Sequence, residues 1–129
     1  MSTVARLCVA LAALSIAGVS APPAHAQSAD GERLFKQRCA ACHLVEPGKS
    51  RPTGPNLHGV VGRSQKAGEG GFKTYSPALQ RLNGKWTEAE LDKFLAAPNR
   101  YAPGTRMVIA VPDTAQRKVI IAYLASLKK

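Results

Sequence analysis

The chain has 129 residues, enough for one small domain. Lys and Arg number 18 against 8 Asp and Glu, giving a formal net charge of +10. Hydrophobic residues make up 45% of the chain, too many for a disordered, highly charged sequence. Aromatic residues make up only 5% and there are 3 Cys, which excludes a large aromatic core and a disulfide-rich scaffold. The composition therefore predicts one small, basic domain.

The first 26 residues have the layout of a secretory signal peptide. Arg6 precedes an uncharged apolar run over 7–19, and Ala24-His25-Ala26 has the small-x-small pattern of a cleavage site. The alternative is an uncleaved membrane anchor, but the run is shorter than the ~20 residues that a spanning helix needs. We predict cleavage after Ala26, which leaves residues 27–129 with a net charge of +9, exported to the periplasm without stable membrane insertion.

Helix signals recur through the predicted domain. They are apolar residues at helical spacing, Ser, Thr or Asp at N-cap positions, and Pro in a first turn. The segments that carry them are 30–41, 77–82, 88–97 and 113–127, whereas 47–71 and 98–112 have neither a helical nor a strand period. We therefore predict an all-α domain of about four helices with long loops. Wrapping a cofactor would account for loops of this length.

The last two predicted helices have specific boundary signals. Thr87 at an N-cap position and Glu90 three residues later predict a capping box, in which each side chain bonds the other residue's backbone N–H. The final helix opens at Asp113 and has an apolar stripe with a period of 3.6 residues. We expect its buried side chains to be Val119, Ile120, Tyr123, Leu124 and Leu127.

The motif with the clearest chemistry is Cys39-Ala40-Ala41-Cys42-His43. Two Cys at positions i and i+3 project to one side, can form thioethers to the two vinyl groups of a haem, and leave the adjacent His to reach the iron. A thioredoxin-like dithiol would need a strand before the helix, which the pattern lacks. A zinc site with His58 would need Cys42 and His43, which are adjacent, to bind one tetrahedral ion. We therefore predict one covalent haem c with its iron.

A second axial ligand for the iron is expected from the second loop. Met107 is the only Met in residues 27–129 and lies in a loop between Pro103-Gly104 and Pro112. A lone Met can also fill a core. His58, fifteen residues after His43, is the competing ligand, and its alternative role is a hydrogen bond that closes its own loop. Loop placement favours Met107.

With these motifs the chain resembles the class I cytochromes c, small soluble carriers of bacteria and mitochondria. The resemblance spans nearly all of residues 27–129, through the segments 39–43, 54–59, 62–63, 75–76, Trp86 and 101–107 in order. It implies His43 as the proximal ligand, oriented by the Pro55 carbonyl, and Met107 as the distal ligand. It also implies that Arg63, Tyr75 and Trp86 hold the haem propionates.

The chain differs from many members of this family at two positions near the expected haem site. Phe94 stands where many relatives carry a Tyr that hydrogen-bonds the Met sulfur, and Ile109 stands where many carry a Phe near the haem edge.

The resemblance implies a monomeric, non-enzymatic carrier of single electrons between membrane or periplasmic redox complexes of a respiratory or photosynthetic chain. Arg38, Arg100 and Arg106 flank the haem-binding segments and would favour partners with acidic docking faces. Dispersed basic residues without interleaved aromatics argue against nucleic acid as a partner. The alternative function is a haem enzyme or gas-binding protein, in which Met107 is off the iron.

Overall fold

Helices account for all the regular secondary structure of the described chain. The computed structural model describes residues 24–66 and 72–127. Within them lie α1 (Ala24–Arg38), α2 (Pro77–Gln80), α3 (Glu88–Ala96), α4 (Pro98–Tyr101) and α5 (Thr114–Ser126). β-Pairing in these ranges consists of isolated bridges, such as Arg51 with Gly54 and Ser64 with Lys85. The prediction of an all-α fold is confirmed, and each of the four predicted helices has a counterpart.

The helix boundaries differ from the prediction at several places, among them the start of α1 at Ala24 rather than residue 30 and the end of α2 at Gln80 rather than residue 82. Helix α1 ends at Arg38 rather than at residue 41, and the chain continues in hydrogen-bonded turns. The N–H of Ala40 bonds the carbonyl of Phe35, five residues back, and the N–H of Cys42 bonds that of Cys39, three residues back. These spacings break the helical pattern of four. Helix α4 is a single turn, with Pro98 in its first turn, inside a segment predicted to be loop.

The start of α1 bears on the predicted cleavage site. The helix begins at Ala24, so it includes the position after Ala26 at which we predict cleavage. Residues 1–23, which hold the apolar run of the predicted signal peptide, lie outside the described residues. The signal peptide therefore stays a prediction. Within the described part of the chain, no helix is both long and apolar enough to cross a membrane.

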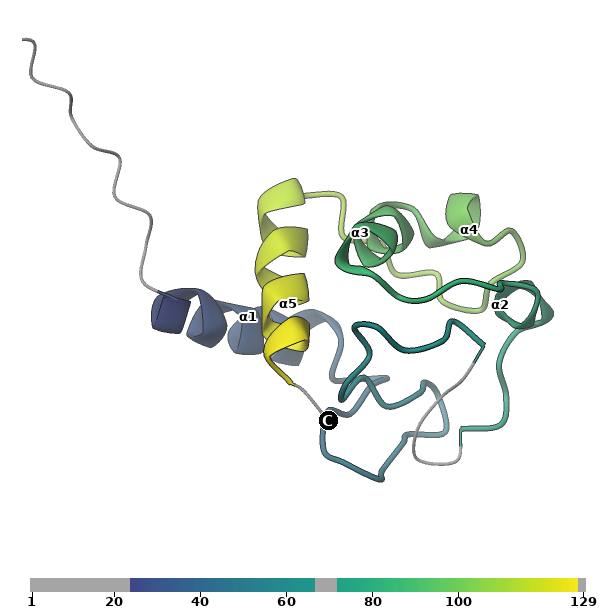
Figure 1. The fold of residues 1–129 in the computed structure, drawn as a ribbon, viewed down its shortest axis with the longest axis horizontal. Helices are drawn as coiled ribbons and strands as arrows, with labels where there is room; N and C mark the ends of the chain where they lie inside the picture. The colour runs from purple at the N-terminus through teal and green to yellow at the C-terminus, as the bar shows by residue number, and fades with distance from the viewer. Residues whose placement is uncertain (1–23, 67–71, 128–129) are drawn as a thin grey trace, which may run out of the picture.

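Helices α1 and α5 cross and pack directly against each other (Figure 1). A side chain at Gly31 would put its Cβ 2.4 Å from Cβ of Tyr123 and 2.6 Å from the carbonyl oxygen of Val119, so only Gly fits here. One turn along α1, the ring of Phe35 packs on that of Tyr123 with centroids 5.8 Å apart. The first and last helices therefore form one unit through a close backbone approach.

The predicted caps of α3 and α5 are formed, but the capping box is only half complete. The Thr87 hydroxyl accepts from the Glu90 N–H at 3.1 Å, and the Asp113 carboxylate accepts from the Gln116 N–H at 2.8 Å. The Glu90 carboxylate does not return to Thr87. It binds Lys93 at 2.7 Å and the Tyr101 hydroxyl at 2.5 Å, because a charged amine and a phenol compete successfully for it.

The buried face of α5 differs in part from the prediction. Ile120, Tyr123 and Leu124 are buried as expected, and Val119 and Leu127 are only half-buried. Ile121 and the guanidinium-bearing Arg117 are buried instead, so the inward face of α5 is turned by a fraction of a helical turn from the predicted stripe.

Candidate functional site

Every residue predicted to form the site lines one cavity. Its volume is about 420 Å³, within the range typical of cofactor sites (roughly 300–1,000 Å³). Its lining comes from the end of α1 with the turns over 39–43 that follow it, the loop over 52–63, the segment 72–76, α2, Trp86, α3, the segment 105–111 and α5. All seven predicted site residues line it, namely Cys39, Cys42, His43, Arg63, Tyr75, Trp86 and Met107.

The His43 ring is held in one orientation by the loop that faces it. Its Nδ1 lies 2.8 Å from the carbonyl oxygen of Pro55. A carbonyl oxygen can only accept, so Nδ1 carries the proton and Nε2 keeps its lone pair. Burial lowers the pKa of His43, with the Pro55 hydrogen bond opposing this more weakly, so the imidazole is neutral. A neutral His with a free Nε2 can bind a metal ion.

Gly54 permits this approach of the loop to His43. A Cβ on Gly54 would lie 2.7 Å from Cε1 of His43 and 2.7 Å from the carbonyl oxygen of Cys42. Real Cβ atoms do not approach other atoms so closely, so a side chain would displace the His43 ring or the Cys42 carbonyl and disturb the contact of the ring with Pro55.

Asn56 stabilises the same loop and has no predicted role. Its side chain is fully buried. The amide Nδ2 donates to the carbonyls of Glu46 and Lys49, and Oδ1 accepts from the N–H of His58 at 2.6 Å. Three backbone groups over residues 46–58 thus depend on one side chain. The position of Asn56 in the 54–59 motif could have marked it as a candidate. The sequence pattern does not indicate which groups its side chain bonds.

The two Cys thiols line the cavity and are not disulfide-bonded. Burial raises the pKa of the Cys39 thiol to about 11, with the nearby positive charge of Arg38 opposing this. Dithiol oxidoreductases need the opposite, a lowered thiol pKa. The described residues also contain no group of three or more His, Cys, Asp or Glu side chains that could hold a metal ion. The dithiol and zinc alternatives thus lack support.

Met107 and His58 differ in their relation to the cavity. Met107 lines it and is half-buried, in a loop where its N–H bonds the Thr105 hydroxyl at 3.3 Å. His58 is not among the lining residues. Its N–H bonds Asn56 and its carbonyl accepts from Arg63 at 3.3 Å, so its backbone closes the loop. Of the two candidate second ligands, only Met107 has access to the cavity.

Polar groups that could hold buried carboxylates line the same cavity. Arg63 donates to the carbonyl of Asn56 at 2.8 Å. Burial raises the pKa of Tyr75, partly offset by the charge of Arg63, so its hydroxyl stays protonated and can donate. The ring of Trp86 is fixed between aromatic neighbours, 5.1 Å from Phe94 and 5.9 Å from Tyr101 between centroids. Cation, hydroxyl and indole are the donors that a buried carboxylate requires.

The donor set fits a covalently attached haem. Two unpaired thiols, a neutral imidazole with a free nitrogen and a thioether line one cavity. The rest of the lining is largely apolar, as an aromatic macrocycle requires, and includes Leu57, Val60, Leu91, Phe94, Leu95 and Ile120.

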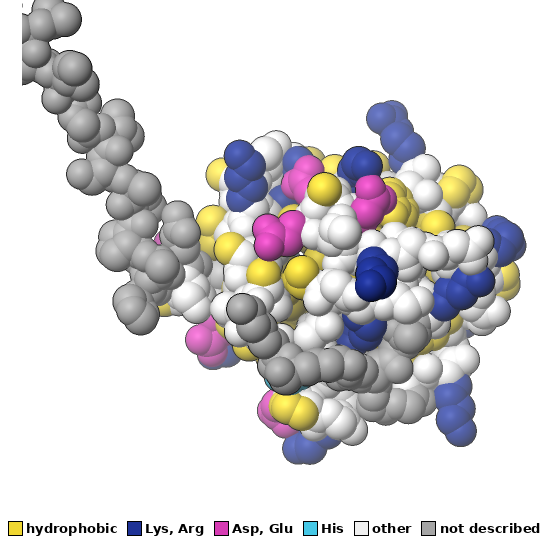
Figure 2. Space-filling view, in the orientation of Figure 1, with side chains coloured by type: hydrophobic (Ala, Val, Ile, Leu, Met, Phe, Trp, Pro, Cys, Tyr) yellow, Lys and Arg dark blue, Asp and Glu magenta, His cyan; other side chains and the backbone are white. Residues whose placement is uncertain are grey.

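The charges around this cavity are predominantly basic. Arg38 and Arg106 are exposed and line it, whereas Arg100 lies on α4 and does not. Figure 2 shows several Lys and Arg side chains along the side of the molecule that carries α2 and α4, while the acidic groups visible in this view lie elsewhere on it. Two of the three predicted Arg residues therefore flank the site.

Comparison with known proteins gives consistent matches. The family model described as "Cytochrome c" matches residues 28–128. A cytochrome c homolog of Bradyrhizobium diazoefficiens is 43% identical over 94 residues, covering 72% of this chain and 50% of that protein. Cytochrome c of Nigella damascena is 41% identical over 98 residues, covering 75% of this chain and 86% of the plant protein. The chain spans only about half the length of the Bradyrhizobium protein.

Among solved structures, cytochrome cH from Methylobacterium extorquens is similar to this chain with a TM-score of 0.66 and 40% identity. The match covers 77% of this chain and 97% of that one. The cytochrome c fold therefore matches in three dimensions as well as in sequence.

Proposed function

Because the chain belongs to the cytochrome c family, whose members bind haem c with its iron covalently, we propose that it is a soluble single-electron carrier with His43 and Met107 as axial ligands. The observation that supports this most is that Cys39, Cys42, His43 and Met107 line one cavity. When bound, the haem supplies a reversible one-electron couple between ferrous and ferric iron.

The protein's contribution to this chemistry is to hold ligands and exclude water. Cys39 and Cys42 would hold the haem through thioethers, and the Pro55 carbonyl keeps Nε2 of His43 available. Met107 provides a soft thioether sulfur, which raises the reduction potential. The apolar lining acts in the same direction, because it disfavours the additional positive charge of the ferric state. Arg63, Tyr75 and Trp86 would hold the propionates.

Substitution of each candidate ligand tests this assignment. Met107→Ala should abolish the sulfur-to-iron absorption band of the ferric protein and lower the midpoint potential. His58→Ala is the matched control and should leave both unchanged, because His58 lies off the cavity. The assignment is wrong if His58→Ala removes the band and Met107→Ala does not.

The alternative function, a haem enzyme or gas-binding protein, requires an open iron position. Carbon monoxide added to the reduced protein distinguishes the two, because an occupied sixth position slows its binding. Slow binding to the native protein and fast binding to Met107→Ala support the carrier. Fast binding to both supports the alternative.

We also propose that residues 1–26 direct export to the periplasm and are removed, and that the mature protein docks as a monomer on acidic faces of respiratory or photosynthetic redox complexes. The intact mass of the exported protein should equal residues 27–129 plus one haem. A mass that still includes residues 1–26 would disprove the removal.

A further inference from the structure

The loop that carries Met107 is fastened on its N-terminal side by hydrogen bonds, two of them local and one to a distant segment. The N–H of Gly104 bonds the side chain of Asn99 at 3.1 Å, and the N–H of Thr105 bonds the carbonyl of Ala102 at 2.9 Å. The guanidinium of Arg106 reaches the carbonyl of Thr74 at 3.0 Å. These contacts leave little freedom before Met107.

The loop has fewer constraints after Met107. Val108 and Ile109 are 80% and 53% exposed, although both line the cavity. Within the described chain, the backbone groups of residues 108–110 make no hydrogen bond. The next backbone contact is the N–H of Val111 with the carbonyl of Leu95 in α3, at 2.8 Å. The position of Met107 on this side therefore depends on how residues 111–112 are held.

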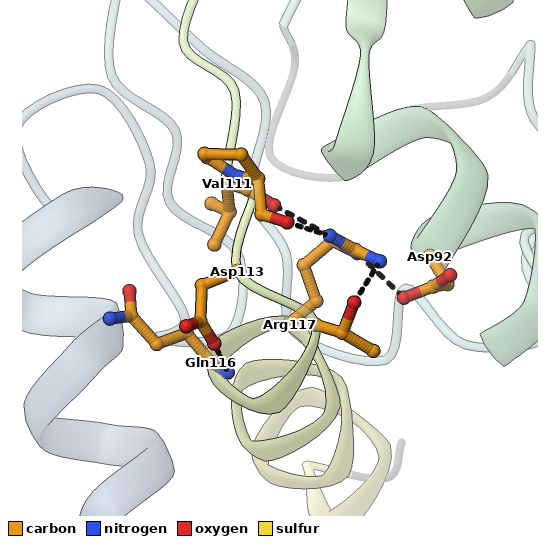
Figure 3. A network of polar contacts seen from close by, with 7 residues as sticks. Asp92, Val111, Asp113, Gln116 and Arg117 are labelled. Atoms are coloured by element: carbon orange, nitrogen blue, oxygen red, sulfur yellow. Dashed lines mark hydrogen bonds and ion pairs between the residues drawn. The ribbon is translucent and has the colours of Figure 1, made fainter.

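Arg117 of α5 holds them. Its side chain is buried, and one nitrogen, Nη1, donates to the carbonyls of both Val111 at 3.0 Å and Pro112 at 2.7 Å. Nε donates to Asp92 of α3 at 2.7 Å, and Nη2 donates to the hydroxyl of Thr114 at 3.1 Å. Figure 3 shows the guanidinium between the loop, α3 and α5, with bonds running to each.

The chemistry of this site requires Arg rather than another cation. A buried guanidinium is costly unless it is paired and its donors are satisfied. Asp92, whose side chain is 40% exposed, supplies the opposite charge without itself being fully desolvated. The planar fork donates in three directions at once, which a single ammonium nitrogen on a flexible stem cannot reproduce.

We propose that Arg117 is a positioning residue for Met107. By fixing residues 111–112 to α3 and α5, it sets how readily the Met107 sulfur leaves the iron. The inference rests on the proposed ligation by Met107 and extends it to a residue that does not line the cavity.

The test measures the rate at which carbon monoxide binds the reduced holoprotein, which reports release of Met107, together with the ferric sulfur-to-iron band. Arg117→Lys keeps the positive charge but loses the planar guanidinium, and should speed carbon monoxide binding tenfold or more. Asp92→Asn keeps an acceptor for Nε and should have a smaller effect, threefold or less. The double variant should speed carbon monoxide binding by less than the product of the two single effects, because both substitutions act on one network.

Loss of global stability must be separated from release of Met107. Ile121→Val is the matched control, because Ile121 is buried on α5 but does not line the cavity. Native protein in enough urea to match the unfolding free energy of Arg117→Lys is a second control. Both controls should bind carbon monoxide at close to the native rate. If Arg117→Lys binds it much faster than both controls, the result supports the proposal.

The proposal is overturned if Arg117→Lys binds carbon monoxide within twofold of these controls while the native protein shows the sulfur-to-iron band. A native protein without that band would refute ligation by Met107, and the role of Arg117 would fall with it. The band of the native protein therefore distinguishes the two failures.

Discussion

At the residue scale, the Pro55 carbonyl determines which nitrogen of His43 can face a metal. The contact is possible because residue 54 has no side chain, so one glycine and one carbonyl together orient the ring. The same loop is closed by Asn56, whose buried side-chain amide donates to the carbonyls of Glu46 and Lys49. The orientation of His43 is therefore set by the loop rather than by a helix.

Gly54→Ala should destabilise the holoprotein by about 1–3 kcal/mol, the usual cost of overpacking, as measured by urea unfolding. It should also shift the midpoint potential, because the new Cβ displaces either the His43 ring or the Cys42 carbonyl.

Gly48→Ala is the control for Gly54→Ala. Gly48 has a φ of +75° and open space around its Cβ, so Ala there adds backbone strain of about 1–2 kcal/mol without touching the site. Equal potentials for the native protein and Gly54→Ala would contradict the steric account.

Several site residues could be predicted from sequence because their signals are local. The spacing of Cys39, Cys42 and His43 and the single Met of residues 27–129 are visible without a structure. Asn56 and Arg117 could not be assigned in this way, because their partners lie on loops and helices that only the fold brings together. Arg117 nonetheless lies three residues before Ile120, on the buried stripe of α5, and a charge at such a position is a signal of a satisfied buried group.

At the scale of elements, the crossing of α1 and α5 anchors the end of α1 from which the Cys residues follow. The crossing depends on a close approach at Gly31 and on the packing of Phe35 against Tyr123. Sequence periodicity predicted these helices, but it did not predict that Glu90 would bind Tyr101, because that contact joins α3 to the end of α4. Local caps were therefore predictable and bonds between elements were not.

Gly31→Ala should lower the free energy of unfolding by about 1–3 kcal/mol, because its Cβ would overlap Tyr123 and the carbonyl of Val119. Helix propensity alone predicts the opposite, a gain of about 1 kcal/mol. Ser28→Ala, at an exposed position of the same helix, is the control and should change the unfolding free energy little. A Gly31→Ala protein as stable as the native one in urea would show that the helices do not pack this closely.

At the scale of the whole molecule, a cofactor-sized cavity explains why so short a chain can have long loops. The loop over 43–66 and the segment 102–112 contain no regular elements of the described structure, yet both contribute lining residues. The sequence predicted these loops by the lack of a period, and a bound haem supplies the apolar surface against which they pack.

The net charge of +9 for residues 27–129, before the haem is counted, should steer the protein to an acidic partner. Association measured by stopped flow should slow as salt rises past about 0.1 M, where the Debye length is about 10 Å. Arg38→Glu should slow it more than Lys118→Glu, because Arg38 flanks the cavity and Lys118 lies on α5 away from it. Equal effects would make the basic surface a feature of solubility rather than of docking.

The central claim, that this chain carries single electrons on a haem with two protein ligands, is tested most directly by an equilibrium redox titration of the exported holoprotein followed by its absorption spectrum. We expect one reversible wave with a one-electron slope, a positive midpoint potential and the same curve in both directions, because the proposed ligands His43 and Met107 would stay bound in both oxidation states. Two waves, hysteresis between the oxidative and reductive directions, or a strongly negative potential would contradict this account.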